Sequence, residues 1–450
     1  MDSQKIEHTK QDILVGSALL SNANTIKLDR LSYAVENMAL NRAFLSADQR
    51  DGSSKLLSDY QQKFKEYRRL WFEQQNEANV KGLTGAGLID NGLVPLCVDV
   101  ETAAICDLAC KFCFRDTLAT PDKIMNEKLF KRIVDQAAEM GVPSMKFNWR
   151  GEPLMNPKLP KYIEYAKNKG ILDTIINTNA THLTKSMSRD LINAGLDFMI
   201  YSFDGGTKET YELMRPGRFK DNLFEDVYSN IVGFHEVREQ IGAKFPFTKI
   251  QMILTDKTYP EQDSFYSLFN ECVDEVTVTH YSERGGNFED LTESQKVEYI
   301  ALCEKLNVPQ GTAYLRDSEG NISVSKKRKP CEQPYQRLLV TYDGRVSMCC
   351  YDWGAMHPVG YVSPNCFENE DADKEEVLKK VEGKRKGYEL LTSVELPPKF
   401  NSPVKIEESL AQIWEGDEIS DVRYKQANDN FDAVKICKGC PFKDTYDWSN

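Results

Sequence analysis

The chain lacks three features that would assign it to large classes of protein. No segment approaches the roughly 18 unbroken apolar residues of a membrane-spanning helix, and the first ten residues, MDSQKIEHTK, contain no apolar signal region. Lys and Arg number 57 against 69 Asp and Glu, with no basic run along one predicted element, so nucleic-acid binding is not favoured. We therefore expect a cytoplasmic protein that does not act on membranes.

Histidine is also scarce, with five residues, whereas cysteine is plentiful, with twelve. In a chain without a secretion signal, cysteines favour metal or redox chemistry over disulfides. The 450 residues, 41% hydrophobic and 28% charged, suffice for two or three domains of an ordinary globular protein.

Three of the cysteines, Cys106, Cys110 and Cys113, stand in a C-x3-C-x2-C array. Zinc sites usually close with four protein ligands from two separate knuckles. Three cysteines on one loop can instead hold three irons of a 4Fe-4S cluster and leave the fourth iron open. The array therefore favours an iron–sulfur site whose open iron binds a substrate or cofactor.

This array, with Phe112 before its last cysteine, resembles the cluster loop of the radical S-adenosylmethionine (SAM) superfamily. In that family the open iron chelates the amino and carboxylate groups of SAM. An electron from the cluster then cleaves SAM to a 5'-deoxyadenosyl radical, which abstracts hydrogen from a substrate. The resemblance implies a 4Fe-4S cluster and SAM as cofactors, and a reductase, flavodoxin or ferredoxin as electron donor.

Residues 95–310 alternate short apolar runs with helical ones, and we expect a helix at 126–140. Strand–helix units with one helix per crossover imply a parallel sheet whose sites lie at the carboxyl ends of its strands. The cluster loop follows the first strand, and the resemblance implies an α/β fold, a partial (β/α)6 barrel. The six predicted strands are 96–101, 144–149, 172–177, 197–203, 248–254 and 275–280.

The segment NWRGEP at 148–153, after the second predicted strand, looks like the family's G-G-E-P motif with Arg150 in place of the first glycine. The resemblance places Gly151 and Glu152 at the amino group of SAM, since a carboxylate pairs with an ammonium. Asn179, which ends the third strand, is either a turn residue or a contact to SAM or substrate.

The later strand ends complete the expected SAM site. Alternation puts Ser202 and Asp204 on the same side of the fourth strand, and similar pairs in the family contact the SAM ribose. The resemblance also places Arg215 at the SAM carboxylate and Gln251 near the adenine. His280 ends the sixth strand at the barrel mouth, where it serves either as a hydrogen-bonding group or in acid–base work.

Residues 1–94 contain no metal motif, but aromatic and apolar residues recur there at helical steps. We expect a helical extension packed on the following domain by Leu57, Tyr60, Phe64, Tyr67 and Trp71. Beyond residue 310 the period changes, and residues 336–342 and 345–350 predict a hairpin with a two-residue primed turn at Asp343-Gly344.

A second group of cysteines marks residues 311–450. Its C-x12-G-x4-C spacing and a later C-x2-C resemble the auxiliary-cluster fold called SPASM, or twitch in its one-cluster form, and LAQIWEG at 410–416 looks like a segment that precedes the last cysteines in many SPASM proteins. Cys350 is an alternative to Cys349 as a metal ligand in this region, and a zinc ribbon is an alternative to an iron–sulfur cluster. Residues 367–405 are expected to form an insertion between the ligand pairs. The resemblance implies a second, auxiliary 4Fe-4S cluster held by Cys331, Cys349, Cys437 and Cys440.

An auxiliary cluster can take an electron from a substrate radical, which gives oxidation, while a thiol that returns hydrogen gives epimerisation. Cys350, Cys366 and His280 are the candidate catalytic groups.

The substrate class is suggested by three features taken together: the N-terminal aromatic helix, NWRGEP and the Cys-Cys end of the hairpin. This combination resembles radical SAM/SPASM proteins associated with carbohydrate assembly. We therefore expect a sugar, sugar nucleotide or other small molecule as substrate. Modification of a ribosomal peptide, or a non-catalytic electron carrier or zinc-stapled binding protein, stays open.

Overall fold

The computed structural model describes most of the chain between residues 54 and 448. Residues 1–53, Cys366 and the expected insertion at 367–405 lie outside the described residues, and His280 is described in its backbone alone. The described ranges are 54–110, 112–113, 122–280, 292–310, 314–316, 320–352, 355, 357–363, 407–438, 440, 442 and 446–448.

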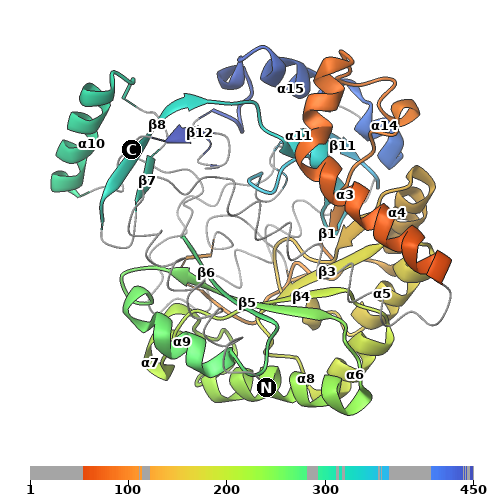
Figure 1. Ribbon diagram of the computed structural model, residues 1–450, viewed down its shortest axis with the longest axis vertical. Coiled ribbons are helices and arrows are strands. Elements are labelled where there is room, and N and C mark those ends of the chain that lie inside the picture. Colours follow the sequence, from red (N-terminus) through yellow and green to blue (C-terminus); the bar gives the residue numbers. More distant parts are fainter. Residues whose placement is uncertain are drawn as a thin grey trace.

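Six parallel strands, paired in sequence order, form the centre of the molecule (Figure 1). All six predicted strands are confirmed, with shifts of a few residues at their ends, and the expected partial barrel is present. The strands are β1 (Cys97–Val100), β2 (Ser144–Lys146), β3 (Asp173–Thr178), β4 (Phe198–Ser202), β5 (Phe247–Leu254) and β6 (Glu275–His280).

Helices fill the crossovers between these strands. The first is the predicted one, because Asn126 caps its start by accepting a hydrogen bond from Lys128 N, and Gly141, at φ +78°, ends it. Its apolar face is buried, and Phe130 stacks on Tyr162 of the next helix with ring centroids 4.0 Å apart. The helices are α4 (Glu127–Met140), α5 (Leu159–Asn168), α6 (Lys185–Asn193), α7 (Lys208–Met214), α8 (Phe224–Ile241) and α9 (Gln262–Phe269).

The predicted hairpin extends the barrel sheet. Its first strand, β9 (Arg337–Val340), runs parallel to β1, and β10 (Arg345–Ser347) and β11 (Gly360–Tyr361) continue the sheet in antiparallel order. The strand order is β11-β10-β9-β1-β2-β3-β4-β5-β6. Residues from the C-terminal third therefore share one hydrogen-bonded sheet with the barrel.

The predicted two-residue primed turn of this hairpin is wrong. Thr341 and Arg345 pair through Thr341 N and Arg345 O at 2.9 Å, which leaves three residues in the loop. Gly344 has a φ of +104°, while Asp343 is not among the residues with positive φ. A glycine after a tight turn forms a bulge at this position, so the loop needs only one residue with positive φ.

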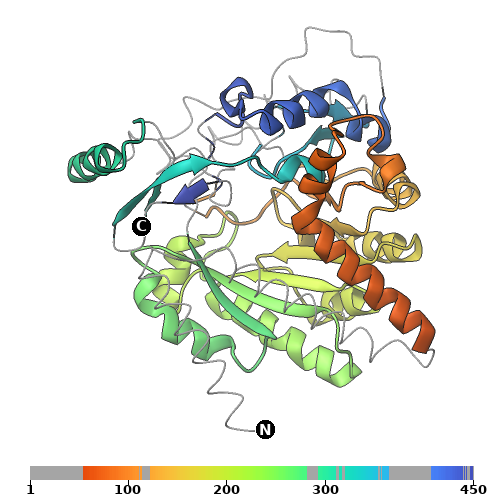
Figure 2. The ribbon, with the colours of Figure 1, turned by 45° about the horizontal axis from the view of Figure 1, so that its top comes forward.

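The N-terminal helix α3 (Ser54–Val80) contacts both halves of the chain (Figure 2). Phe64 and Tyr67 are buried against Leu96 at the start of the barrel, as the aromatic stripe predicts. The side-chain amide of Gln74 donates to Val94 O at 2.8 Å and also to Tyr335 O in α11 (Gln333–Gln336). The side chains of Leu57 and Tyr60 lie outside the described residues.

A second, three-stranded sheet has the order β12-β8-β7. Helix α10 (Glu293–Leu306) packs on this sheet, where Tyr299 and Cys303 contact Val324. The helix lies apart from the barrel (Figure 1). The domain boundary expected at residue 310 thus falls inside a packed unit, and the boundaries stay a prediction. The strands are β7 (Tyr314–Arg316), β8 (Ile322–Arg328) and β12 (Tyr446–Trp448).

Two C-terminal helices follow, α14 (Leu410–Trp414) and α15 (Asp417–Ala427). Helix α14 contacts α4 of the barrel, and α15 contacts α11. The indole of Trp414 is buried and donates to Leu93 O at 2.8 Å, and Arg423 lies over its ring at 4.1 Å. In the described part of the chain, no helix is long and apolar enough to cross a membrane.

Candidate active site

The cysteine array lies on the loop after β1, as predicted. Cys110 is buried and Cys106 and Cys113 are half-buried. The backbone N–H of Cys113 donates to Cys110 O at 3.0 Å, so the second and third cysteines are joined by a tight turn. The loop therefore places the three thiols at the carboxyl end of β1, where parallel sheets form their sites.

A segment after α7 holds this loop in place. Leu108 and Gly217 form an antiparallel bridge, and Ala109 N donates to Pro216 O at 2.8 Å. Arg218 donates from its backbone to Asp107 O at 2.7 Å and from its guanidinium to Cys106 O at 2.6 Å. Gly217 cannot be replaced without movement, because a Cβ there would lie 1.8 Å from Lys220 O.

Arg215 connects the fourth strand to the array. Its Nε donates to Asp204 Oδ2 at 2.7 Å, and its Nη1 lies 3.7 Å from Cys110 Sγ. Burial raises the pKa of the Cys110 thiol to about 12, and the Arg215 charge opposes that rise. The guanidinium also lies over the ring of Phe112 at 5.4 Å. Arg215 is therefore already engaged by the protein on both sides.

The NWRGEP segment packs directly on the chain that leads into the cysteine loop. Gly151 has a φ of +64°, and a Cβ there would lie 2.2 Å from Ala103 O. The backbone N–H of Glu152 donates to Ile105 O at 2.8 Å. Only glycine fits a left-handed position against a backbone carbonyl at this distance. The motif thus fixes the approach of the second strand end to the cysteine loop.

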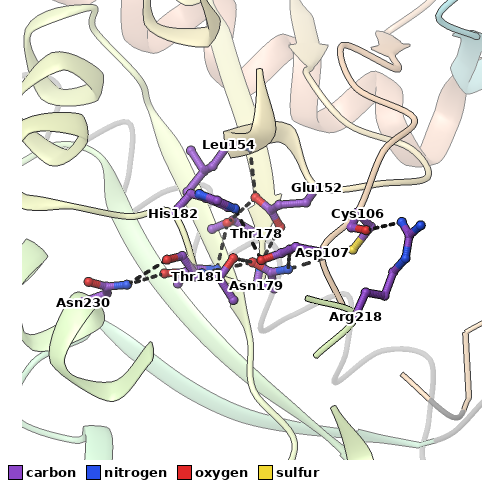
Figure 3. A network of polar contacts seen from close by, with 11 residues as sticks. Cys106, Asp107, Glu152, Leu154, Thr178, Asn179, Thr181, His182, Arg218 and Asn230 are labelled. Atoms are coloured by element: carbon purple, nitrogen blue, oxygen red, sulfur yellow. Dashed lines mark hydrogen bonds and ion pairs between the residues drawn. The ribbon is translucent and has the colours of Figure 1, made fainter. Parts of the chain in front are cut away.

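The carboxylate of Glu152 is buried and joins three segments (Figure 3). It accepts hydrogen bonds from Leu154 N at 3.0 Å, Thr178 Oγ1 at 2.6 Å and Asn179 N at 2.7 Å. Burial raises the pKa of Glu152 to about 7, against the effect of these donors. Both carboxylate oxygens already accept hydrogen bonds from the protein. The predicted contact with the SAM amino group would therefore use the lone pairs of these oxygens that the three donors leave free.

Two polar residues that the sequence did not suggest complete this network (Figure 3). Asp107 accepts from Asn179 Nδ2 at 2.9 Å and pairs with His182 Nε2 at 3.4 Å. Burial would raise the pKa of Asp107, but hydrogen bonds from His182, Thr181 and Asn179 lower it. The available signals were the position of Asp107 inside the cysteine array and the position of His182 just beyond a strand end.

The remaining predicted SAM contacts lie on adjacent strands. Ser202 and Gln251 are partners in the register of β4 and β5, and both are half-buried. Asp204 is fully buried and accepts from Ile253 N at 2.6 Å as well as from Arg215. Ser202 and Gln251 are thus available to a ligand, whereas Asp204 is occupied within the protein.

The second cysteine group also comes together. Burial raises the pKa of Cys331, and the charges of Cys440, Cys437 and Cys350 add to the rise, which makes these thiols electrostatic neighbours. A hydrogen bond with Cys350 and burial raise the pKa of Cys349, and the charges of Cys331 and Cys440 contribute further. All five cysteines of the C-terminal third that the structure describes therefore share one region.

Gln426 of α15 bridges two of these predicted ligands. Its Oε1 accepts from Cys331 N at 2.8 Å, and its Nε2 donates to Cys437 Sγ at 3.2 Å. Tyr351 N donates to Cys349 Sγ at 3.3 Å. Cys350 instead packs beside Trp149, Leu339 and Ala355 in a small apolar cluster. Hydrogen bonds to sulfur are typical of cysteines that hold iron–sulfur clusters.

The number and chemistry of the thiols can be compared with the two kinds of metal site. A zinc ion needs four ligands at about 2.0–2.3 Å from one centre, whereas the cysteines of a 4Fe-4S cluster each bind a different iron. The grouped thiols, with N–H donors beside them, fit 4Fe-4S clusters.

Comparisons with known proteins support the family resemblance of the cysteine array. Residues 100–236 match the model of the Radical SAM superfamily. The chain is 26% identical over 165 residues to the tungsten-containing aldehyde ferredoxin oxidoreductase cofactor-modifying protein of Pyrococcus furiosus, an alignment that covers 36% of this chain and 44% of that protein. It is 31% identical over 126 residues to a probable GTP 3',8-cyclase of Methanothermobacter marburgensis, covering 28% of this chain and 41% of that protein.

The chain thus spans less than half the length of these curated relatives. Among solved structures, BtrN in complex with AdoMet and 2-DOIA aligns with a TM-score of 0.39 and 14% identity, over 78% of this chain and 97% of that one. The superfamily match runs from the last residue of β1 into α8, and this part carries the cysteine array, NWRGEP and the Asp204–Arg215 pair. The part of this chain from residue 100 to residue 236 therefore belongs to the radical SAM superfamily.

Proposed function

We propose that this radical SAM enzyme abstracts hydrogen from a sugar, sugar nucleotide or other small molecule, and that an auxiliary 4Fe-4S cluster assists its oxidation or epimerisation. The observation that carries the proposal is the contact between the NWRGEP segment and the C-terminal cysteine group. Trp149 of the NWRGEP segment packs with Cys350 of the C-terminal cysteine group in one buried cluster. The NWRGEP segment and the C-terminal cysteine group are therefore in direct contact.

Cys106, Cys110 and Cys113 would hold the first cluster, and Cys331, Cys349, Cys437 and Cys440 the second. When bound, the first cluster and SAM supply reductive cleavage of SAM and a radical that abstracts hydrogen. The protein contributes position and electrostatics. Arg215 sets the charge beside Cys110, and Asp204 orients Arg215 by accepting from its Nε at 2.7 Å.

SAM would lie across the strand ends from Gly151 to Gln251. Ser202 and Gln251, which are register partners with half-buried side chains, are suited to direct contacts with its ribose and adenine. Glu152 and Asn179 belong to one hydrogen-bonded network beside the cysteine loop, so they would position the methionyl end. Each of these roles is part of the proposal.

The auxiliary cluster is tested first by metal content. The full chain, purified and reconstituted without oxygen, is expected to bind about eight irons and no zinc, and Cys437→Ala about four. A wild-type protein with about four irons and one zinc would contradict the auxiliary cluster and support a zinc ribbon.

The substrate class is tested by turnover. The reconstituted protein is incubated with SAM, dithionite and panels of sugars, sugar nucleotides and peptides, and 5'-deoxyadenosine is measured by mass spectrometry. A deuterated sugar or sugar nucleotide is expected to increase 5'-deoxyadenosine and to transfer deuterium to it. Stimulation by peptides alone would contradict the small-molecule assignment, and Cys106→Ala is the control for cluster-independent cleavage.

A further inference from the structure

Gln426 of α15 joins the two parts of the C-terminal cysteine group. Its side chain is 1% exposed and contacts two buried cysteines that lie far apart in the sequence. Its Oε1 accepts a hydrogen bond from Cys331 N at 2.8 Å, and its Nε2 donates to Cys437 Sγ at 3.2 Å. One amide therefore connects the first predicted ligand of this group with the C-x2-C pair.

The backbone of Cys331 fixes the direction of these hydrogen bonds. A backbone N–H can only donate, so the oxygen of the Gln426 amide must face Cys331 N. The NH2 group of the amide then faces the sulfur of Cys437. A neutral thiol is only a weak acceptor, whereas a metal-bound thiolate carries negative charge and accepts a hydrogen bond more strongly. A buried amide that donates to sulfur at this distance is therefore suited to a cysteine that holds a cluster.

Other elements hold the backbone of the same two cysteines. Gln75 of α3 donates from its side chain to Cys331 O at 3.0 Å, and Arg328 of β8 donates from its guanidinium to Cys437 O. Both of these contacts reach backbone oxygens, whereas the contact from Gln426 to Cys437 reaches the sulfur. Loss of the Gln426 NH2 group alone should therefore leave the two cysteines in place.

We propose that Gln426 is a positioning residue for the auxiliary cluster: its oxygen holds Cys331, and its NH2 group raises the reduction potential of the cluster through the sulfur of Cys437. The inference rests on the proposed function, in which both cysteines hold that cluster. A cluster gains one negative charge on reduction, so a hydrogen-bond donor to one of its sulfurs stabilises the reduced state. The donor thus makes the cluster a better electron acceptor.

Two substitutions separate the two ends of the amide. Gln426→Glu keeps an oxygen for Cys331 N and replaces the NH2 group beside Cys437 with a second oxygen, whereas Gln426→Leu removes both contacts. Gln74 offers a matched control, because its amide is also 1% exposed but donates to two backbone oxygens outside the cysteine group. Gln74→Leu therefore removes a buried amide without removing a contact to sulfur.

The test is an EPR-monitored redox titration of the full chain, reconstituted without oxygen. All variants are made in a Cys106→Ala parent, which is expected to lack the SAM-binding cluster. Gln426→Glu is expected to keep about four irons and to lower the ratio of reduced to oxidised cluster about tenfold at a fixed solution potential, which corresponds to about 59 mV for one electron. Gln426→Leu is expected to lower this ratio as well and, because Cys331 loses its contact, to release iron faster to a chelator.

Gln74→Leu is expected to leave the potential unchanged. The inference is overturned if both Gln426 variants titrate like the parent, if Gln74→Leu shifts the potential equally, or if neither Gln426 variant holds a cluster, since the residue would then be structural only. A parent protein that binds zinc and gives no cluster signal would instead overturn the proposed auxiliary cluster, and the inference with it. Because that result is read from the parent alone, the two failures are distinguishable.

Discussion

The guanidinium of Arg150 binds the carboxylate of Glu101 through two hydrogen bonds, from Nε to Oε1 at 2.6 Å and from Nη2 to Oε2 at 2.7 Å. Both side chains are buried, and Glu101 also accepts from Tyr342 N at 3.1 Å in the hairpin loop. Arg150 stands where the family motif has a glycine. In this chain the position therefore links the NWRGEP segment, the end of β1 and the C-terminal hairpin.

Removal of one partner of this pair should be costly. Glu101→Gln leaves the Arg150 charge buried without its carboxylate, so we expect the free energy of unfolding to fall by about 3–5 kcal/mol. The double variant Glu101→Leu/Arg150→Met replaces both charges with apolar side chains and should lose much less. Urea denaturation of the wild type and both variants measures these effects. A loss below about 1 kcal/mol in Glu101→Gln would show that the pair does not hold these segments together.

Gly151→Ala should displace the cysteine loop. The new Cβ would lie 2.2 Å from Ala103 O and 2.7 Å from Ile105 O, both backbone atoms. We expect iron content to fall by about four per chain and the protein to lose thermal stability. Gly141→Ala is the matched control, because Gly141 also has positive φ, +78°, but no atom lies within 4 Å of the place that its Cβ would take. That variant should cost about 1 kcal/mol and keep its iron; equal iron loss in both would refute the steric argument.

Glu152 should make stability depend on pH. Burial raises its pKa in the folded protein to about 7, from an ordinary value of 4.5. Between these values the folded state binds more protons than the unfolded state, so this contribution is present below about pH 4.5 and is lost as pH rises through about 7. This difference between the pKa values of Glu152 in the folded and unfolded states corresponds to about 3 kcal/mol in the free energy of unfolding.

Glu152→Gln is the matched variant for that titration, because it keeps the shape of the side chain but cannot ionise. Unfolding free energies at about pH 5 and about pH 8, on either side of the raised pKa, should show a larger decrease in the wild type than in the variant. An identical pH dependence in the two proteins would mean that the Glu152 carboxyl is ionised throughout this range.

The adjacent cysteines of the hairpin end should differ in their roles. Cys349 Sγ accepts from Tyr351 N at 3.3 Å, whereas Cys350 packs with Trp149, Leu339 and Ala355. We expect Cys349→Ser to lose about four irons, and Cys350→Ser to keep about eight. Iron analysis and EPR of the reduced proteins measure this. The reverse pattern would make Cys350 the ligand and Cys349 the free thiol.

Local patterns predicted the barrel well because each of its elements is determined by nearby residues. Asn126 and Gly141 define α4, and alternating burial defines β5. The hairpin loop was mispredicted because Asp343-Gly344 fits both a primed turn and a bulge, and only the pairing of Thr341 with Arg345 distinguishes them.

Contacts between residues far apart in sequence could not be predicted in this way. β9 pairs with β1 across about 240 residues, from Cys97 to Arg337, and no local pattern specifies such a partner. Asp204 and Arg215 were both predicted at the SAM site, but their pairing follows from how α7 returns over β4. Asp107 and His182 were missed for the same reason, since their contact depends on the fold.

The most direct measurement of the central claim is SAM cleavage. Wild type and Cys106→Ala are reconstituted without oxygen and reduced with dithionite, and 5'-deoxyadenosine is measured by mass spectrometry. We predict 5'-deoxyadenosine from the wild type and none above background from the variant. Absence of 5'-deoxyadenosine from wild-type protein with confirmed cluster loading would contradict the proposed radical mechanism.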